Sequence, residues 1–514
     1  MIENEKKSMR GHVVVVSPAS GRDNSRKLAA DLIGDIGEGR GVTVIAPSSN
    51  STKDGNHLAD ALRDCANIIK KKSTSIKLGV VVGFERSFLA ELFWLHDIPA
   101  VQIIGEAPQG YEEARLFYKY LRYLGAIIYT SEEVRDKIHR DFLHAEAIAS
   151  HVFRDSSQLA SRIEQLILDL ETRRDAEMAG RSILCGKKFL DTQYSYPWLR
   201  KSASRAIADY TTSWSTGINL RKPFPGFHPG VYAEMNGVKG IDPSVHYILA
   251  EQPAGSWSTT VIRPGNFRSR RKSCIKAAIQ LHIYYPEMAA DLIYRIGRSK
   301  SRPDIFVSVP TEQALIAVQK DFMAFNDRKV VIRIVPNRGR DIGPILTEFA
   351  AELEEYEVIG HFHTKKSLQY ANRIMVKSWN NFLAENVLGG KKAMIDVILQ
   401  NMENDSELGL VFPDDPDVIG WTKNRDQAVA LMKRMGINAK LPERFINFPV
   451  GTMFWARTAA LQPLFDLKID WTDYPEEPTP VDGTILHAIE RILPLVSEQC
   501  GFRNAVTHVM NVLK

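Results

Sequence analysis

The first part of the chain alternates short apolar runs with segments of helical periodicity. The runs His12–Ser17 and Val42–Ala46 are rich in β-branched residues, and a helical pattern lies between them. Further apolar runs follow at Leu78–Val82, Pro99–Ile104 and Ala126–Tyr129. Continuous apolar strands that alternate with helices are typical of a parallel sheet covered on both faces. Residues 1–172 are therefore predicted to form a doubly wound, Rossmann-like α/β domain.

Two glycine-containing segments of this domain, Gly83–Arg86 and Gly105–Gly110, directly follow predicted strands, where such sheets bind ligands. They match no phosphate-binding glycine motif, so plain turns are the alternative interpretation. The element order, with Thr130–Ile138 after a strand, resembles the N-terminal half of a GT-B glycosyltransferase. The half of that fold that binds the donor is not recognisable here. The resemblance therefore implies a domain that binds an acceptor or partner, or a relic.

Residues 173–272 are less periodic and richer in aromatic and basic residues, which predicts a helical connector. The segments Phe227–Tyr232 and Asp242–Tyr247 resemble a short module found beside bacterial polysaccharide glycosyltransferases. Their alternative interpretation is that the aromatic side chains form the core of the connector. The basic run Phe267–Lys272 is a solvated linker or a contact with membrane lipid phosphates.

The last part restarts the alternation of strands and helices. Strands are predicted at Ala277–Tyr284, Ile305–Val309, Val330–Val335 and Val358–His363. Helices are predicted at Glu287–Ile296, Thr311–Phe325 and Ile345–Leu353. This pattern predicts a second, mostly parallel sheet within residues 273–514.

The loop after the third of these strands carries the residues PNRGRDIGP. Glycine turns and helix N-termini present backbone amides to anions. Arg338 and Arg340 add guanidinium forks suited to phosphate. Asp341 is suited to accept a hydrogen bond from a ribose or base, or to cap the following helix. Asn337–Asp341, which includes Gly339, is therefore predicted to bind a phosphate-bearing donor.

The next strand ends in His361-Phe-His363-Thr-Lys365-Lys366. His361 and His363 share one face of the strand, and Phe362 points to the other. Lys365 and Lys366 favour a nearby negative charge such as a diphosphate, so donor binding is the preferred interpretation. A metal site and structural hydrogen bonding are the alternatives, although no third metal ligand is evident nearby in the sequence.

Two later segments carry further candidates. Gly451, Trp455 and Arg457 lie in an aromatic run and are predicted to line an acceptor or sugar pocket, with core packing as the alternative for the aromatic residues. Glu477 and Asp482 precede a helical pattern, where a carboxylate could deprotonate an attacking hydroxyl. Helix capping by Asp482 is the structural alternative.

Composition narrows the class of protein. Among 514 residues, 44% are hydrophobic and 25% charged, so the chain can form well-packed cores. The net charge of +5 is a small basic excess, and no nucleic-acid-binding motif is present, so a nucleic-acid partner is not expected. Four dispersed cysteines and the absence of a signal-like or membrane-spanning apolar stretch predict a cytoplasmic protein. Any contact with a membrane would be peripheral, at its inner face.

The motifs HIYYPEM, NRGRDIGP, HFHTKKS, LGLVFP, FPVGTMFWAR and a late E…DGT…HAIER occur in this order between residues 275 and 505. Together they resemble the rhamnan synthesis protein F family. The resemblance implies sugar transfer, typically of rhamnose from a dTDP donor, during assembly of a cell-surface polysaccharide or O-antigen. The implied partners are a nucleotide-diphosphate sugar and a glycan or lipid-linked acceptor.

The layout also resembles a GT-A glycosyltransferase, in which a strand ends in an Asp-x-Asp motif. His361-Phe-His363 takes that place here, and divalent metals bound with phosphates prefer carboxylate oxygens. No metal and no other cofactor is therefore expected. By position, the resemblance implies Asp482 as catalytic base of an inverting displacement, with Glu477 as the alternative. A catalytically inactive glycan- or partner-binding protein and a metal-dependent hydrolase are the competing hypotheses.

Overall fold

The architecture is described from a computed structural model. The structure describes residues 12–16, 42–45, 76–82, 89–95, 98–104, 117, 119–129, 131–141, 149–152, 156–196, 203–239, 241–265, 272–364, 373–390, 392–480, 482–510 and 512. The candidate segments Gly83–Arg86, Gly105–Gly110 and Phe267–Arg271 lie outside these residues, as do Lys365 and Lys366.

The chain divides into two compact units, each formed by several segments. The N-terminal unit consists of Met1–Lys187, Ile207–Leu220 and Gly240–Val245. The C-terminal unit consists of Lys188–Ala206, Arg221–Lys239 and His246–Lys514. The expected boundary at residue 172 falls inside one helix, α7 (Ser156–Gly186), and the expected connector is shared between both units. The division into three domains therefore stays a prediction.

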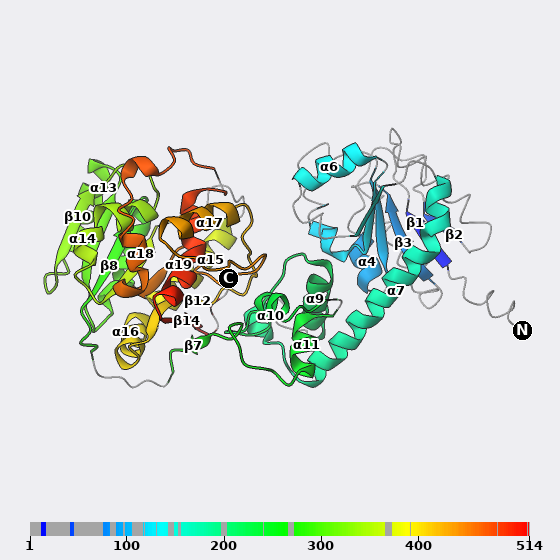
Figure 1. Ribbon diagram of the computed structural model, residues 1–514, viewed down its shortest axis with the longest axis horizontal. Coiled ribbons are helices and arrows are strands. Elements are labelled where there is room, and N and C mark those ends of the chain that lie inside the picture. The colour runs from blue at the N-terminus through cyan, green and yellow to red at the C-terminus, as the bar shows by residue number, and fades with distance from the viewer. Residues whose placement is uncertain are drawn as a thin grey trace, which may run out of the picture. The chain divides into compact units, whose positions relative to one another are not determined.

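The N-terminal unit contains a six-stranded parallel sheet in the order β2-β1-β3-β4-β5-β6. The strands are β1 His12–Val16, β2 Val42–Ile45, β3 Ile76–Val82, β4 Ala100–Ile104, β5 Ala126–Tyr129 and β6 Ala149–Val152. The helices are α4 Leu89–Leu95, η1 Leu121–Tyr123, α6 Glu132–Asp141, α7 and most of α9 Ala203–Thr216. Both α4 and α7 lie along the sheet (Figure 1). The predicted α/β class is confirmed for this unit.

The C-terminal unit is built on an eight-stranded mixed sheet in the order β10-β9-β8-β11-β13-β12-β14-β7. Its strands are β7 Thr260–Ile262, β8 Ala277–His282, β9 Asp304–Val309, β10 Val330–Ile334, β11 Val358–His363, β12 Leu408–Pro413, β13 Phe454–Arg457 and β14 Arg503–Thr507. All neighbours pair in parallel except β13, which runs antiparallel to both β11 and β12. The strand β7 lies within the range predicted as connector, so the sheet begins earlier in the chain than expected.

Helices cover both faces of this sheet, and each face has its own hydrophobic core (Figure 1). The first core includes residues of α12 Ala289–Gly297, α13 Glu312–Phe322, α15 Arg373–Val387 and α16 Met394–Asn404. The second includes residues of η4 Pro344–Glu348, α14 Ala350–Leu353, α17 Arg425–Arg434, η5 Thr458–Leu461, α18 Gln462–Phe465 and α19 Ile485–Gln499. Short helices complete the unit: α8 Thr192–Ser195, α10 Pro229–Met235, η3 Pro286–Met288, η6 Trp471–Asp473 and the part of α11 Pro243–Leu249 that begins at His246. The helix predicted at Ile345–Leu353 is instead the π-helical turn η4 followed by the four-residue α14.

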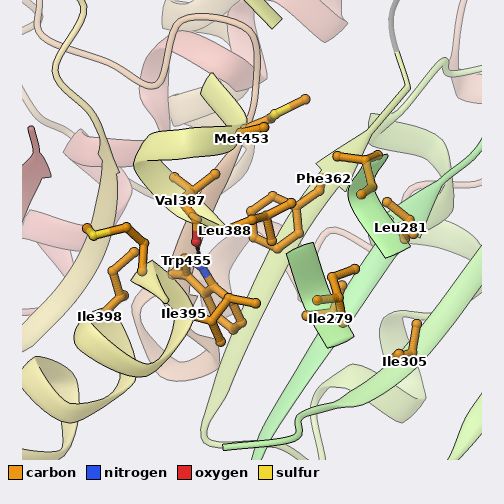
Figure 2. Packing of buried hydrophobic residues seen from close by; sticks show 14 of the residues in the cluster. Ile279, Leu281, Ile305, Phe362, Val387, Leu388, Ile395, Ile398, Met453 and Trp455 are labelled. Carbon is orange, nitrogen blue, oxygen red and sulfur yellow. Dashed lines mark hydrogen bonds between the residues drawn. The ribbon is translucent and has the colours of Figure 1, made fainter. Parts of the chain in front are cut away.

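Residues of each strand alternate between the two cores, as the two-residue period of a strand requires. In β11, Val358 and Phe362 enter the first core and Ile359 enters the second. Figure 2 shows Phe362 packed beside Trp455 of β13 in the first core. The predicted separation of Phe362 from His361 and His363 is therefore confirmed.

The aromatic residues expected in the connector pack against one another. Phe227, Tyr232, Tyr247 and Trp257 form one buried cluster, and the rings of Phe227 and Tyr247 stack with their centroids 4.3 Å apart. The Tyr232 hydroxyl contacts the Nδ1 atom of His246 at 2.8 Å. This geometry supports the structural interpretation of these aromatic residues, in which they form a local core.

Candidate active site

The candidate site lies at the carboxyl edge of three adjacent parallel strands, β8, β9 and β11. Their registers pair His361 with Gln280, His363 with His282, and His282 with Ser308. These side chains share one face of the sheet, above the second core. Ligands of open α/β sheets bind outside the carboxyl ends of strands, so the position suits a binding site.

A chain of buried hydrogen bonds crosses these strands. The Nδ1 atom of His361 lies 2.7 Å from Gln280 Oε1, and Gln280 Nε2 donates to Ser308 Oγ at 3.1 Å. Ser308 Oγ also lies 2.9 Å from Nδ1 of His282. None of these four side chains is exposed beyond a few per cent. Burial of a polar group costs free energy unless the group is hydrogen-bonded. These hydrogen bonds therefore fix the orientation of the His361 and His282 imidazoles.

Asp341 joins this network from the loop after β10. Its Oδ2 atom lies 3.4 Å from Nε2 of His361 and 3.8 Å from Nε2 of His363. Unlike the histidines, the Asp341 side chain is 18% exposed. The sequence placed Asp341 and the two histidines in one donor-binding site, and the structure brings these three residues together.

Gly451 connects the histidines to helix α19. Its carbonyl accepts a hydrogen bond from His363 Nε2 at 2.8 Å, and its N–H donates to Glu490 Oε1 at 2.7 Å. Glu490 also accepts from the Thr452 hydroxyl at 3.2 Å. The predicted pocket residue Gly451 therefore lies at the histidine cluster, where its backbone rather than a side chain makes the contacts.

The two arginines of the loop face a later segment of the chain. Arg338 donates to the Tyr474 carbonyl at 2.6 Å and to the Thr472 carbonyl at 3.1 Å. Arg340 donates to the carbonyls of Thr479 and Pro480, each at 3.3 Å. Asn337 is exposed. The arginine forks predicted to bind phosphate are thus partly occupied by residues 472–480.

Gly339 shapes this loop. Its φ is +73°, and a Cβ atom placed on it would lie 2.8 Å from Tyr474 Cδ2 and 2.9 Å from the Cα of Gly343. Only glycine fits a left-handed backbone packed this closely. The turn therefore requires glycine and fixes the positions of the flanking residues Arg338 and Arg340.

The two predicted catalytic carboxylates are both engaged. Asp482 Oδ2 accepts from the Thr422 hydroxyl at 2.6 Å, and Oδ1 accepts from Asn424 Nδ2 at 2.6 Å. Partial burial raises the pKa of Asp482, but these two hydrogen bonds and the nearby Arg491 outweigh it, so its pKa lies below the usual range. Glu477 accepts from the Thr479 N–H at 2.8 Å and lies 3.5 Å from Arg340. The roles of Asp482 and Glu477 as catalytic base stay predictions.

Two predicted pocket residues are placed elsewhere, and their assignment is corrected. Trp455 is completely buried in the first core, where its indole N–H donates to the Val387 carbonyl at 2.9 Å (Figure 2). Arg457 pairs with Val358, at the amino end of β11, and its guanidinium binds the Leu408 carbonyl at 3.1 Å. Because β13 is antiparallel to β11, these residues lead away from the edge that carries the histidines.

Gln280, His282, Ser308 and Glu490 were not predicted as site residues. A signal existed for two of them, since Gln280 and His282 are polar residues spaced two apart in the otherwise apolar run AAIQLHIY. Polar residues on one face of a buried strand must find partners. The contribution of Ser308 and Glu490 depends on strand register and helix packing, which the sequence does not show.

We expect the buried His282 to make unfolding pH-dependent. Burial lowers its pKa from 6.5 to about 4; the Asp341 carboxylate opposes this shift, and His363 and His361 add to it. Between these pH values the unfolded chain binds a proton that the folded chain does not, so the free energy of unfolding falls as pH decreases from 6.5 towards 4. At 1.36 kcal/mol per pKa unit, His282 contributes a loss of about 3 kcal/mol.

Hydrogen exchange of β8 and β11 peptides, followed in the full chain as urea increases at pH 7.0 and at pH 4.5, measures this effect. The variant His282→Asn, which keeps a polar group near the Nδ1 position, should show a smaller difference between the two pH values than the unchanged protein. The pKa values of His228 and His508 are also lowered, first of all by burial, and both residues are present in each protein, so the comparison isolates His282. Equal pH dependence in both proteins would contradict the prediction.

Two further features of the structure concern metal ligands and membrane-spanning helices. Among the residues the structure describes, no group of three or more His, Cys, Asp or Glu side chains is arranged to hold a metal ion. No helix within the described part of the chain is both long and apolar enough to cross a membrane.

Comparisons with known proteins cover different shares of the chain. Two curated relatives, one from each of two strains of Xanthomonas campestris pv. campestris, are both named "Uncharacterized protein WxcX". Each is 34% identical to this chain over 173 residues. The match covers 32% of this chain and 24% of each relative, so the chain spans about a quarter of their length.

A solved UDP-N-acetylglucosamine 2-epimerase from Rickettsia bellii is 9% identical and covers 64% of this chain and 69% of its own, with a TM-score of 0.23. This similarity is too low to support an argument about function. The family model described as "Rhamnan synthesis protein F" matches residues 240–501, which is more than half of the chain and includes every described residue of the candidate site. The chain therefore belongs to the rhamnan synthesis protein F family.

Proposed function

We propose that the C-terminal unit is a glycosyltransferase that takes part in the synthesis of a cell-surface polysaccharide or O-antigen. The donor is a nucleotide-diphosphate sugar, with dTDP-rhamnose as the first choice, and the acceptor is a glycan or a lipid-linked glycan. The protein acts in the cytoplasm, with peripheral contact at the inner face of the membrane. The proposal rests on family membership and on the residues gathered at the carboxyl edge of β8, β9 and β11.

The observation that carries the proposal is the convergence of Asp341, His361 and His363 beside an arginine-bearing glycine turn. Such a site combines a carboxylate for hydroxyl groups with cationic forks for a diphosphate. Lys365 and Lys366 follow His363 directly in the sequence and are proposed to add positive charge. Positive groups around the leaving diphosphate would stabilise the charge that develops in the transition state.

The reaction is proposed as a single displacement. The acceptor hydroxyl loses its proton to a carboxylate, its oxygen bonds to the anomeric carbon, and the bond to the diphosphate breaks with its electron pair. The anomeric configuration inverts. Asp482, with Glu477 as the alternative, is the base implied by position in the family, and the site supplies no Asp-x-Asp pair for a divalent metal.

Release of nucleoside diphosphate from a panel of dTDP-, UDP- and GDP-sugars tests this function. The full chain is supplied with oligosaccharide or lipid-linked acceptors, with EDTA in one series and Mn²⁺ in another. We expect acceptor-dependent release from one donor in the presence of EDTA. Release that requires Mn²⁺ would contradict metal independence. No release under any condition would favour a glycan-binding protein without catalytic activity.

Loss of the Glu477 carboxylate is expected to strengthen donor binding. Glu477 lies 3.5 Å from Arg340 and competes with an incoming phosphate for its guanidinium. An exposed ion pair contributes about 1 kcal/mol or less, so Glu477→Gln should lower the Kd for the donor by up to about fivefold. Titration calorimetry without acceptor measures this Kd.

Glu476→Gln is the matched control for this change. The Glu476 side chain is 87% exposed and lies 4.0 Å from Arg338, so its loss should change the Kd by less than Glu477→Gln does. Weaker binding in Glu477→Gln would show instead that this carboxylate contacts the donor.

A further inference from the structure

The N-terminal unit contains a pocket that the proposed function does not use. The pocket lies at the amino ends of β4 and β5, where Pro99 and Gly125 precede the two strands. Its walls come from α4, η1, α7 and α9, and all of its lining residues belong to this one unit. Open α/β sheets usually bind ligands at the carboxyl ends of their strands, so the fold alone does not predict this pocket.

Charged residues line the pocket along one face of α7. Arg173, Glu177 and Arg181 are spaced four residues apart, so their side chains project from the same side of the helix. Arg174 also lines the pocket. Three arginines and a single glutamate give the lining an excess of two positive charges, and like charges held close together repel one another.

The Glu177 carboxylate is already bound to other groups of the pocket. Its Oε1 atom accepts from the Arg181 guanidinium and from the Thr212 hydroxyl, each at 2.5 Å. The Nε atom of Arg181 donates to the Thr211 hydroxyl at 3.2 Å. Glu177 therefore neutralises Arg181, and the excess positive charge falls on the remaining two arginines of the lining.

Arg173 has only neutral hydrogen-bond partners within the described part of the chain. Its Nε atom donates to Ser215 Oγ at 2.6 Å, and Nη2 donates to the Ser215 carbonyl at 2.8 Å. Nη1 lies 3.4 Å from the Gly125 carbonyl. Burial lowers the pKa of Arg173, and the charge of the more distant Glu177 opposes this shift. Burial of a guanidinium among neutral groups costs free energy, which a bound anion would offset.

The other side of the pocket suits the ring of a ligand. Trp94 of α4 and Tyr123 of η1 form an aromatic wall, with their ring centroids 5.0 Å apart. The Trp94 indole N–H donates to Thr212 Oγ1 at 2.8 Å, which fixes the orientation of the indole. The Thr216 hydroxyl donates to the Thr212 carbonyl at 2.8 Å, and its oxygen can still accept from a ligand hydroxyl. Ligand pockets combine apolar and aromatic walls with a few polar groups in this way.

We propose that this pocket binds the phosphate monoester of a sugar. The phosphate contacts Arg173 and Arg174, whose guanidinium forks match its oxygens. The sugar ring lies against Trp94 and Tyr123. A phosphate monoester carries about 1.5 to 2 negative charges at pH 7, which matches the excess of two positive charges in the lining. The inference concerns the N-terminal unit alone and does not depend on sugar transfer by the C-terminal unit.

Titration calorimetry of the full chain with inorganic phosphate, a hexose 1-phosphate and a nucleoside 5′-monophosphate tests the site. We expect one of the two sugar phosphates to bind at least about tenfold more tightly than inorganic phosphate, because only a sugar phosphate reaches the aromatic wall. The probe that binds more tightly distinguishes a hexose from a nucleoside. Hydrogen exchange with that probe should show increased protection of η1, β5 and α7 peptides, which locates the binding site.

Arg173→Gln removes the charge and keeps a hydrogen-bond donor. It should weaken binding of the sugar phosphate by about tenfold or more, because hydrogen bonds between two charged groups are among the strongest in proteins. Arg135→Gln is the matched control. Arg135 lies on α6 of the same unit, outside the lining, and pairs with Asp136 at 2.8 Å. This control should bind the probe as the unchanged protein does.

Trp94→Leu provides a second measurement that does not depend on the folding of Arg173→Gln. It removes the indole from the aromatic wall and leaves the arginines of the lining in place. Its affinity for the sugar phosphate should fall to that for inorganic phosphate, while the affinity for inorganic phosphate stays the same. Unchanged affinity for the sugar phosphate would refute the contact between the sugar ring and this wall.

Four results would overturn the inference. The unchanged protein could bind none of the three probes, or folded Arg173→Gln could bind the sugar phosphate as tightly as the unchanged protein does. Equal affinity for all three probes would show an adventitious ion only. Loss of binding in Arg340→Gln, with increased protection confined to the C-terminal sheet, would place the probe at the candidate active site instead.

Discussion

Replacement of Asp414 by alanine is expected to destabilise the C-terminal unit by about 3–5 kcal/mol, because it leaves the buried positive charge of Lys222 without a negative partner. Asp414 follows β12 and is completely buried. It accepts from the Lys222 ammonium at 2.6 Å and from the Gly226 N–H at 2.6 Å. Lys222, only 3% exposed, would keep Asn447 at 2.8 Å as a neutral acceptor, which cannot balance its charge.

Hydrogen exchange of β12 and β14 peptides, followed in the full chain as urea increases, measures this loss. A local probe is needed because a chain with two units need not unfold in one step. Glu407→Ala is the control. It breaks an ion pair with Arg503 at 3.3 Å in which both side chains are more than half exposed, and the expected change is about 1 kcal/mol or less.

A double variant distinguishes the effect of an unpaired buried charge from the effect of lost packing. Replacing both members of a buried ion pair by apolar residues is often nearly neutral. The pair Asp414→Leu with Lys222→Met should therefore be less destabilising than Asp414→Ala alone. If the double variant is as unstable as the single one, the uncompensated charge of Lys222 is not the cause.

The sequence predicted which side chains of the candidate site lie together where the strand period and strand direction alone decide their positions. The two-residue period of a strand separated His361 and His363 from Phe362, and the structure confirms that separation. The position of the NRGRD loop after β10 brought Asp341 to the carboxyl edge of the same sheet. Both inferences needed only the strand period and the parallel direction of the strands, which continuous apolar runs indicate.

Predictions failed where the outcome depended on the direction of a strand. Gly451, Trp455 and Arg457 were assigned to one pocket because they are close in the sequence. The strand β13 (Phe454–Arg457) runs antiparallel to β11, so the chain moves roughly 10 Å from Phe454, which pairs with His361, to Arg457, which pairs with Val358 at the amino end of β11. No local pattern in FWAR distinguishes an antiparallel strand from a parallel one.

Contacts between residues that are distant in the sequence could not be predicted from the sequence either. Arg338 and Arg340 have the charge and position of phosphate-binding residues, yet they bind carbonyls more than 130 positions further along the chain. The two hydrogen bonds that Asp482 accepts from Thr422 and Asn424 likewise come from a different loop. Residue type and spacing indicate what a side chain can bind, but the folded chain determines what competes for it.

Substitution of Gly451 by alanine is expected to disable the site, because the peptide at this position is held from both sides. Its φ is +86°, and an added Cβ would lie 2.8 Å from Leu383 Cδ1 and 3.1 Å from Trp379 Cζ2. The left-handed backbone costs a non-glycine residue about 1–2 kcal/mol. The clash adds to this cost or shifts the loop, and a shift breaks the hydrogen bonds to His363 and Glu490.

We therefore expect Gly451→Ala to lower turnover by about 100-fold or more, because misplacement of site residues by about 1 Å can cost that much. Turnover of the donor identified by the panel measures this loss, and hydrogen exchange of β13 peptides, followed in the full chain as urea increases, measures the accompanying loss of stability. Gly436→Ala is the matched control. Gly436 also has a positive φ, +71°, but no atom lies within 4 Å of its added Cβ. The control should show the backbone cost alone, with turnover unchanged. Equal turnover in the two variants would show that the contact between His363 and the Gly451 carbonyl does not position the site.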